Sequence, residues 1–372
     1  MPSQSDFSRR LFMAGGLLSG LALRNARAQA PEKVPYPIID SHIHFFDSSR
    51  PQGVPYGAGR PPALPEVYRF IAEPLGVVGA IEVEASPWVE DNLWVLDISQ
   101  KATMMVGFVG NLEPEKPPFR EYLERYHRHP LFRGIRYGNL WGRNLGEMVS
   151  NPEFLSGIKE LAAADLVLDT ANPTPDLMEA IVRLTDRVPN LRVVLDHLPS
   201  MTALDDRSTR KGVEESLREL SKRKAFAKIS AVPRRENGRV ITDPAAYKPR
   251  LDLLLDIFGE DRVVYGSDWP NSAGNWVSFE AALAPVRQYF DAKGRAVAEK
   301  YFWKNSLAAY KWVKREPRQP SAAERFALSP GGVLCSDFRG ELSATAWPLR
   351  RRRAHPLLRN AFRLSGILAV LR

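Results

Sequence analysis

Eight short apolar segments, separated by segments of helical periodicity, constrain the fold of this 372-residue chain more than any other feature. The apolar segments have the length and the β-branched content of buried strands. The segments between them repeat their apolar residues every three or four positions, as helices do. Strands that alternate with helices form a parallel sheet, and eight strands favour a closed barrel over an open doubly wound sheet. The sequence therefore predicts an α/β fold of the (β/α)8, or TIM, barrel class.

The predicted strands lie within the stretches 37–47, 75–84, 104–110, 132–137, 166–169, 191–196, 225–230 and 262–266. Helical patterns cover 91–100, 119–127, 154–164, 176–187, 213–222 and 250–258, and a last helix is predicted at 296–313. Residues 47–65 are rich in proline and glycine, which predicts a long loop. No glycine-rich nucleotide-binding motif follows a predicted strand, and this argues against a nucleotide site.

Polar side chains occur where the predicted strands end. They are His42 and His44 on the first strand, Glu84 on the second, Arg136 on the fourth, Asp169 on the fifth, His197 on the sixth and Asp268 on the eighth. The reacting residues of a (β/α)8 barrel come from the carboxyl ends of several strands. These side chains would therefore meet at one mouth if the barrel closes. A solvated, polar strand end is the simpler alternative for Asp40, His42 and His44, which alternate along the first strand.

Three motifs, taken together, resemble the amidohydrolase superfamily. They are Asp40-Ser41-His42-Ile43-His44, Leu195-Asp196-His197-Leu198-Pro199 and Tyr265-Gly266-Ser267-Asp268-Trp269-Pro270. More narrowly they resemble its amidohydrolase-related branch, which holds dicarboxylate lactonases, sugar-acid lactonases and metal-dependent decarboxylases. The resemblance spans roughly residues 36–313, the length of a barrel. It implies a barrel of the metal-dependent-hydrolase type, in which the aspartate on the last strand, here Asp268, activates water.

The chain departs from the binuclear members of that superfamily, because it has neither a fourth histidine at a predicted strand end nor a lysine at the end of the fourth strand. At most one metal ion is then expected, with His42, His44, His197 and Asp268 as its ligands and zinc as the favoured ion. The lactonase members suggest the alternative that no metal is needed and the histidines stabilise the oxyanion. In both versions Asp268 is the general base. A turn or helix-capping residue is the structural alternative for Asp268.

Four residues near the predicted strand ends are candidates for binding substrate: Arg136, Glu84, Trp269 and Asn271. A guanidinium group matches a carboxylate, so Arg136 is expected to hold an anionic group or else to form a salt bridge in the barrel wall. Glu84 is expected to bind sugar hydroxyls or to orient another residue, with surface solvation as the alternative. Trp88 and Trp141 are candidates for lining the pocket or packing in the core. Asp196 is expected to face away from the mouth and orient a neighbour, although strand phase can exchange it with His197.

The predicted function is hydrolysis of a lactone, a cyclic ester of a sugar acid or a related compound. The substrate is expected to be a small molecule that is anionic or derived from a sugar. A mononuclear metal-dependent decarboxylase or amide hydrolase is the alternative within the superfamily. A non-catalytic small-molecule-binding barrel is the alternative from another class. The net charge of +9 does not indicate nucleic-acid binding, since much of the basic excess lies at the two ends of the chain.

The ends of the chain differ from its middle. Residues 1–30 combine Arg9-Arg10, a short apolar stretch and Ala26-Arg27-Ala28, which resembles a twin-arginine signal peptide. This predicts a periplasmic protein exported by the twin-arginine machinery, with a barrel domain over 31–315; an uncleaved membrane anchor is the alternative. The composition of residues 316–372 predicts a poorly ordered basic extension. Weak contact of this segment with a membrane surface is the alternative. The single cysteine, Cys335, cannot form an internal disulfide.

The two arginines of the leader allow a direct test. Changing Arg9 and Arg10 to lysine should abolish export through the twin-arginine route, because that route recognises the arginine pair. Fractionation of the producing cells, with the processed protein detected by immunoblot, measures the effect. Normal processing of the lysine variant would remove the twin-arginine assignment.

Overall fold

A sheet of eight parallel strands forms the centre of this protein, whose computed structural model describes residues 35–54 and 60–315. Each strand pairs with the next along the chain, in the order β1-β2-β3-β4-β5-β6-β7-β10. The strands are β1 (Ile38–Ile43), β2 (Val77–Val83), β3 (Met105–Gly110), β4 (Phe132–Arg136), β5 (Val167–Asp169), β6 (Arg192–Leu195), β7 (Ala225–Ile229) and β10 (Val263–Tyr265). A separate antiparallel hairpin consists of β8 (Arg235–Glu236) and β9 (Arg239–Val240).

The first strand meets the segment that follows the last strand. The backbone N–H of Asp268 donates to the carbonyl of His42, and the N–H of His44 donates to the carbonyl of Trp269, both at 2.8 Å. Ile43 and Trp269 form a parallel bridge at the same place. The eight strands therefore form a nearly closed barrel, which confirms the predicted TIM-barrel class.

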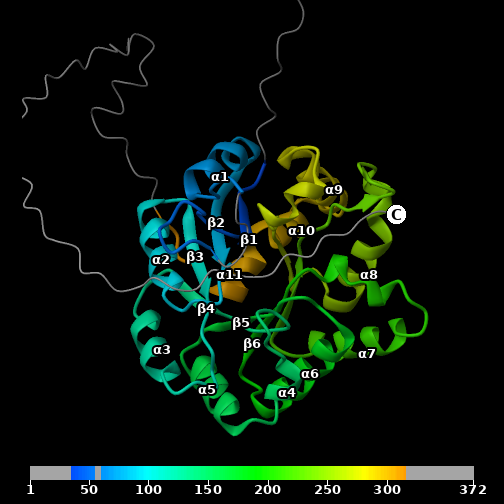
Figure 1. Cartoon of the computed structure of the whole chain (residues 1–372). Helices are drawn as coiled ribbons and strands as arrows, with labels where there is room; N and C mark the ends of the chain where they lie inside the picture. The colour runs from blue at the N-terminus through cyan, green and yellow to red at the C-terminus, as the bar shows by residue number, and fades with distance from the viewer. Residues whose placement is uncertain (1–34, 55–59, 316–372) are drawn as a thin grey trace, which may run out of the picture. The chain divides into compact units, whose positions relative to one another are not determined.

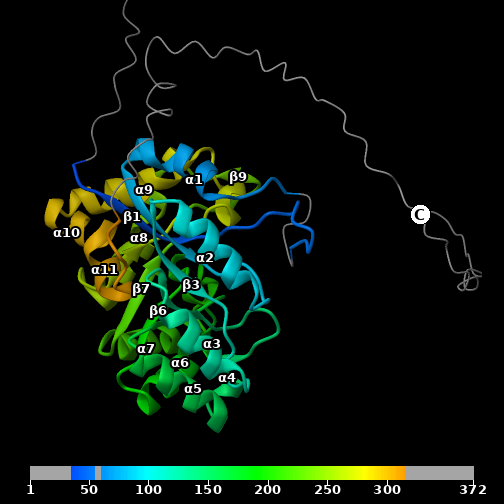
Figure 2. The same cartoon turned by 90° about the vertical axis from the view of Figure 1, so that its left-hand side faces the viewer.

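Most of the helices surround the strands, and α11 lies over the middle of the barrel in Figure 1; Figure 2 gives the view from the side. The helices are α1 (Pro65–Ala72), α2 (Asp91–Lys101), α3 (Phe119–His127), α4 (Leu145–Met148), α5 (Pro152–Ala163), α6 (Pro175–Arg187), α7 (Arg210–Ser221), α8 (Lys248–Phe258), α9 (Phe279–Ala292), α10 (Arg295–Glu299) and α11 (Asn305–Tyr310). Side chains that accept hydrogen bonds from the first turn fix several starts: Asn151 caps α5, Thr174 caps α6 and Ser278 caps α9.

Six of the predicted helices, α2, α3, α5, α6, α7 and α8, are confirmed within a few residues. Helices α1 and α9 were not predicted. Helix α1 follows directly on a proline- and glycine-rich stretch, and α9 contains Pro285, which sequence patterns read as a helix breaker. The predicted last helix is divided, because a π-helical segment (Lys300–Lys304) separates α10 from α11 and the helix ends at Tyr310.

Two apolar clusters hold the barrel together. The larger one lies between the strands and the helices. The smaller one is rich in valine and isoleucine and draws its residues from β1, β2, β3, β5, β6 and β10, as expected for the interior of a TIM barrel. Tyr310 of α11 belongs to this inner cluster. Arg192, at the start of β6, donates to the carbonyl of Ala309, so α11 lies across the amino-terminal ends of the strands.

Close packing of β4 against β5 depends on Gly134. A Cβ atom at this position would lie 2.2 Å from the carbonyl oxygen of Val167, far inside van der Waals contact. Glycine is thus the residue type that allows these two strands to pair in the observed register, in which Gly134 faces Val167.

A buried acid in the barrel wall, Glu82, should make the stability of the fold depend on pH. Glu82 of β2 is 0 % exposed, and among the described residues its Oε2 has no hydrogen-bond partner. Burial raises its pKa well above the ordinary value. The protonated form therefore stabilises the fold. This contribution is fully present below the unfolded pKa of about 4.3 and is lost as pH rises through the folded pKa.

Replacing Glu82 by glutamine keeps the shape and removes the ionisable group. We expect the variant to melt above the wild type at pH 8, by roughly 2–4 °C for each kcal/mol regained, and to lose this advantage near pH 4. Thermal unfolding at the two pH values measures the effect. The exposed Glu236→Gln is the control, and a Glu82→Gln advantage that does not depend on pH would contradict the explanation.

Within the described ranges, no helix has both the length and the apolar character needed to cross a membrane. The predicted signal peptide, the predicted basic extension and residues 55–59 of the predicted loop lie outside the described residues.

Candidate active site

The carboxyl end of β1 directs two histidine rings toward one point at the barrel mouth. The Nε2 atoms of His42 and His44 lie 3.1 Å apart. The pairing of β1 with β2 is irregular between Asp40 and Ile43, and such irregularities re-aim side chains next to functional sites. His44 Nδ1 lies 2.7 Å from the carbonyl oxygen of Val83, which can only accept a hydrogen bond. The proton of a neutral His44 is therefore on Nδ1, and its Nε2 presents a lone pair.

Asp268, in the turn after β10, completes the group. Its Oδ1 lies 3.0 Å from His44 Nε2, 3.5 Å from His42 Nε2 and 3.8 Å from His197 Nε2. Its Oδ2 accepts a hydrogen bond from the Ser272 hydroxyl at 2.5 Å. The left-handed backbone of Asp268, with φ of 62°, belongs to this tight turn. Segments more than 200 positions apart in sequence thus meet at one point, as the strand-end argument predicted.

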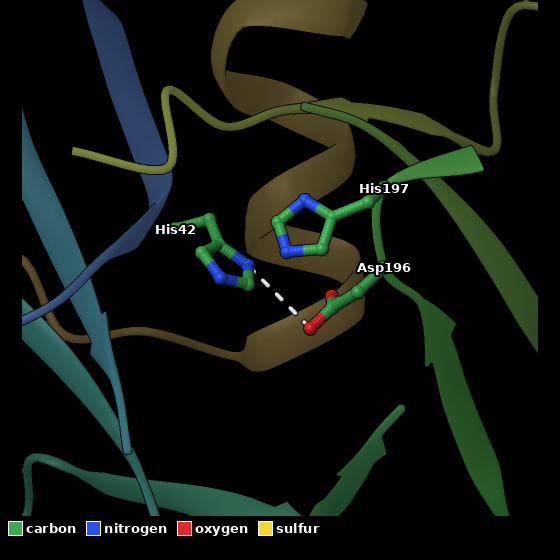
Figure 3. A group of neighbouring side chains, drawn as sticks. All are labelled: His42, Asp196 and His197. Atoms are coloured by element: carbon green, nitrogen blue, oxygen red, sulfur yellow. Dashed lines mark ion pairs between the residues drawn. The ribbon is translucent and has the colours of Figure 1, made fainter. Parts of the chain in front are cut away.

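His197 enters the same group from the end of β6. Its backbone is also left-handed, with φ of 54°. The hydroxyl of Ser230 lies 2.8 Å from its Nδ1 and holds the ring, whose centroid is 4.4 Å from that of His42. Figure 3 shows the two rings side by side, with the Asp196 carboxylate directed toward His42 at 3.5 Å. The structure therefore places His197 at the mouth and Asp196 behind it, where Asp196 contacts His42.

The ionisation states suit metal binding or general base catalysis. Burial alone would raise the pKa of Asp268, but His197, His44 and His42 outweigh it and hold that pKa well below its usual range. Burial lowers the pKa of His42 and of His197. At neutral pH Asp268 is therefore ionised, and burial favours the neutral forms of His42 and His197, which are the protonation states that coordinate zinc.

The spacing of the donor atoms fits a single divalent ion. Two ligands of a tetrahedral ion with bonds of about 2.0–2.1 Å stand about 3.3 Å apart. The three distances among His42 Nε2, His44 Nε2 and Asp268 Oδ1 are 3.0, 3.1 and 3.5 Å. The lone pairs of His44 Nε2 and Asp268 Oδ1 would face each other at 3.0 Å without a cation or a proton between them. A second set of donors, His42, Asp196 and His197, also lies within 4.8 Å.

These groups lie at the base of a cavity of about 580 Å³. It is large enough for a small-molecule substrate. Its lining combines apolar side chains with polar ones that reach it from several strand ends and loops. Among the lining residues are His44, His197, Asp268, Glu84, Arg136, Trp141, Asn172, Ser200, Arg234, Tyr247, Arg250, Asn271 and Asn275.

Three of the four predicted substrate-binding residues line this cavity: Glu84, Arg136 and Asn271. Glu84 is buried rather than solvated, and the Nε1 of Trp141 donates to its carboxylate at 3.1 and 3.2 Å. Arg136 is also buried; its Nε donates to the carbonyl of Thr170 at 3.0 Å. Arg136 therefore belongs to the barrel wall and to the cavity at the same time.

Trp269 is the exception among the four. It is 6 % exposed, its ring centroid lies 5.2 Å from that of Tyr68, and it borders a separate apolar hollow beside α1. Adjacent residues of the turn point in different directions, so Asp268 faces the cavity and Trp269 faces the helices. Trp88 likewise lies outside the cavity lining. Asp40 does not join the histidines either; its carboxylate accepts from the Tyr68 hydroxyl at 2.6 Å and the Ser267 N–H at 2.8 Å.

A buried lysine below the histidines was missed by the sequence reasoning. Lys228 of β7 is 0 % exposed, and its Nζ lies 2.7 Å from Asp169 and 2.8 Å from Asp196. The strand pattern contained the information: Ala225, Ala227 and Ile229 belong to the outer apolar cluster. The alternation therefore turns the side chain of Lys228 toward the barrel interior.

Comparison with known proteins agrees with this arrangement. Residues 39–312 match the family model described as amidohydrolase. An L-fucono-1,5-lactonase of Burkholderia ambifaria is 28 % identical over 264 residues, which cover 68 % of this chain and 88 % of that protein. An L-fucono-1,5-lactonase of Burkholderia multivorans is 24 % identical over 285 residues, 73 % and 94 % of the two chains.

Solved structures share the architecture. An amidohydrolase of Burkholderia multivorans, determined with bound HEPES and in another crystal form with bound zinc, superposes with a TM-score of 0.65 at 22 % identity. The match covers 74 % of this chain and 100 % of that one. A 5-carboxyvanillate decarboxylase of Novosphingobium aromaticivorans with manganese has a TM-score of 0.53 at 18 % identity, covering 74 % and 96 %. These likenesses confirm the barrel fold.

Proposed function

Because the chain belongs to the amidohydrolase family and is a hydrolase, we propose that it opens a sugar-acid lactone at the mouth of its barrel. One observation carries the proposal. A single carboxylate oxygen, Asp268 Oδ1, lies within 3.8 Å of the Nε2 atoms of three histidines at the base of a cavity. The relatives named L-fucono-1,5-lactonase support the choice of a lactone.

The reaction needs one proton acceptor that later becomes a proton donor. Asp268, ionised at neutral pH, takes a proton from water as the water oxygen forms a bond to the lactone carbonyl carbon. The bond between that carbon and the ring oxygen then breaks. Asp268 returns the proton to the ring oxygen, so that water has been added across the ester. The Ser272 hydroxyl holds the carboxylate in place through Oδ2.

His42, His44 and Asp268, with His197 beside them, are the residues that would hold a metal ion. A bound divalent ion such as zinc would polarise the carbonyl as a Lewis acid. The protein fixes the rings for this role, since the Val83 carbonyl orients His44.

The charge distribution of the cavity wall favours a neutral, hydroxylated ring over a dicarboxylate. Arg234 and Arg250 are paired with carboxylates at 2.9 and 2.6 Å. Asp268 adds negative charge, which would repel a carboxylate. Burial raises the pKa of Glu84 and so disfavours its charged form. Glu84 can accept hydrogen bonds from sugar hydroxyls, and Arg136 can donate to them.

A substrate panel tests the proposal. The purified protein would be assayed with 1,5- and 1,4-lactones of several aldonic acids, with a pyrone dicarboxylate, and with an aromatic carboxylate that releases CO₂ on decarboxylation. We expect acid release, followed with a pH indicator, from the aldonic lactones. Turnover restricted to the pyrone or to CO₂ release would move the assignment to a dicarboxylate lactonase or to the decarboxylase alternative. Binding without turnover of any ester or amide would favour the non-catalytic barrel.

Metal content gives a separate prediction. The donor spacing leads us to expect one zinc or similar ion per chain, and removal by a chelator should lower the lactonase rate at least about 10²-fold. Elemental analysis and assays before and after chelation measure both. Full activity in metal-free protein would instead support oxyanion stabilisation by the histidines alone.

A further inference from the structure

A cluster of buried, charged side chains lies below the histidines and takes no part in the proposed hydrolytic step. At its centre the Nζ of Lys228 lies 2.7 Å from Asp169 Oδ2, 2.8 Å from Asp196 Oδ1 and 3.1 Å from His42 Nδ1. These three groups come from the ends of three different strands. The ammonium group, which has three protons and no acceptor capacity, donates to Asp169 Oδ2 and forms an ion pair with Asp196 Oδ1. When His42 Nε2 coordinates an ion, the proton of the neutral ring is on Nδ1, which faces Asp196 Oδ2 at 3.5 Å.

The partners of Lys228 are also ligand types for divalent metal ions. Two carboxylates and an imidazole converge on one point, and all of these side chains are 0 % exposed. In the described part of the chain, Asp196 belongs with His42 and His197 to the second of the two donor sets that could hold an ion. That set shares His42 with the set at the mouth, and Lys228 forms an ion pair with the Asp196 carboxylate that belongs to it.

We propose that the Lys228 ammonium, which lies between Asp169 and Asp196, is a cation supplied by the protein in place of a second metal ion below the mouth, and that it thereby limits the centre to one metal ion. The place for the single ion, among His42, His44 and Asp268, opens to the cavity through His44 and Asp268. The lower place, between Asp169 and Asp196, contains the ammonium group. Asp169 Oδ1 and both oxygens of Asp196 accept no hydrogen bond from the described residues, so ion pairing is what compensates these buried carboxylates.

Charge balance supports this assignment. Burying two carboxylates without a cation is costly, because each negative charge loses its hydration and gains no partner of opposite charge. Lys228 and Arg136, whose Nε lies 3.4 Å from Asp196, provide two positive charges against Asp169 and Asp196. The lower layer is thus neutral as built. A divalent ion added to it would leave an excess of buried positive charge.

The lower place is also shielded from solvent. The ring of Tyr310 lies 5.2 Å from the Lys228 Nζ, and its hydroxyl donates to Asp169 Oδ2 at 2.8 Å. Lys228, Asp169 and Tyr310 are all buried, with exposures of 0, 0 and 1 %. An aromatic face and a hydroxyl therefore complete the surroundings of the ammonium group.

Metal counting in a charge-deleted variant tests the inference. Lys228→Met removes the ammonium and keeps an unbranched side chain. Wild type and variant would be refolded with zinc and, separately, with manganese, desalted, and analysed for metal per chain. We expect the variant to carry one ion more than the wild type. Adding Asp169→Asn to the variant should cancel the gain, and Lys224→Met, exposed just before β7, should match the wild type.

Each outcome decides the question. Equal metal counts in folded Lys228→Met and wild type would overturn the proposal. A variant that stays unfolded by circular dichroism even with either ion present would also overturn it, since the ion should then replace the ammonium. The inference rests on the proposed ion site at the barrel mouth, but the count is a difference measured without substrate. Failure of the lactone panel would therefore leave it standing.

Discussion

Asp268→Asn is expected to lower kcat of the lactonase reaction by about 10²–10⁴-fold while leaving the protein folded. The amide keeps the size of the side chain and can still contact Ser272, but it cannot take a proton from water. Asp268 is the carboxylate that contacts all three histidines, so no other group at this point can replace it as base. Steady-state rates with the best lactone, together with thermal unfolding, measure the two effects.

The same substitution at the other end of β10 serves as control. Asp261→Asn lies just before β10, where the side chain is 72 % exposed, and should keep the wild-type rate. Zinc content should be measured for both variants, because it separates loss of the base from loss of a ligand. A rate for Asp268→Asn within about threefold of the wild type would refute the assignment of the general base.

Gly266→Ala is expected to damage the site through its backbone. A Cβ atom on Gly266 would lie 2.7 Å from the Cβ of His42, 3.1 Å from that of Ser230 and 3.4 Å from the Cδ of Lys228. His42 must then move, and displacement of a reacting group by about 1 Å can cost about 10² in rate. Overpacking should also destabilise the fold by roughly 1–3 kcal/mol. Rates and chemical denaturation measure the two losses.

Gly212 of α7 offers the matched control. No atom would meet a Cβ there within 4 Å, and its backbone is helical. Gly212→Ala should therefore leave the rate unchanged and stabilise the protein by roughly 0.5–1 kcal/mol. A Gly266→Ala variant with wild-type kcat would show that His42 can shift without consequence for the reaction.

The sequence allowed the barrel and the upper half of the site to be predicted for one reason. Apolar runs locate buried strands, and in a parallel barrel the residues that follow those runs must come together. His44, His197 and Asp268 follow such runs, and His42 lies at the carboxyl end of one, so their meeting followed from topology alone. The orientation of individual side chains did not follow. Asp268 and Trp269 are neighbours in one turn, and their divergence depends on local backbone angles that no periodicity shows.

The lower half of the site was beyond this kind of reasoning. Lys228 lies inside a strand rather than after it, and a lysine there conflicts with the rule that interior positions are apolar. Its burial becomes understandable only with Asp169, Asp196 and His42 in place around it, and these contacts link segments 32 to 186 positions apart. Pairwise charge compensation of this kind is visible in space and not along the chain.

The position of α11 has a consequence for how the molecule can be divided. A continuous line of polar contacts runs through the barrel axis, from the Tyr310 hydroxyl to Asp169, Lys228 and His42, and from there to Asp268. The last turn of α11 is thus connected, through Asp169 and Lys228, to His42, whose ring contacts the Asp268 carboxylate at the base of the cavity. A chain shortened before α11 would lose the far end of this line, so the catalytic mouth and the opposite end of the barrel behave as one unit.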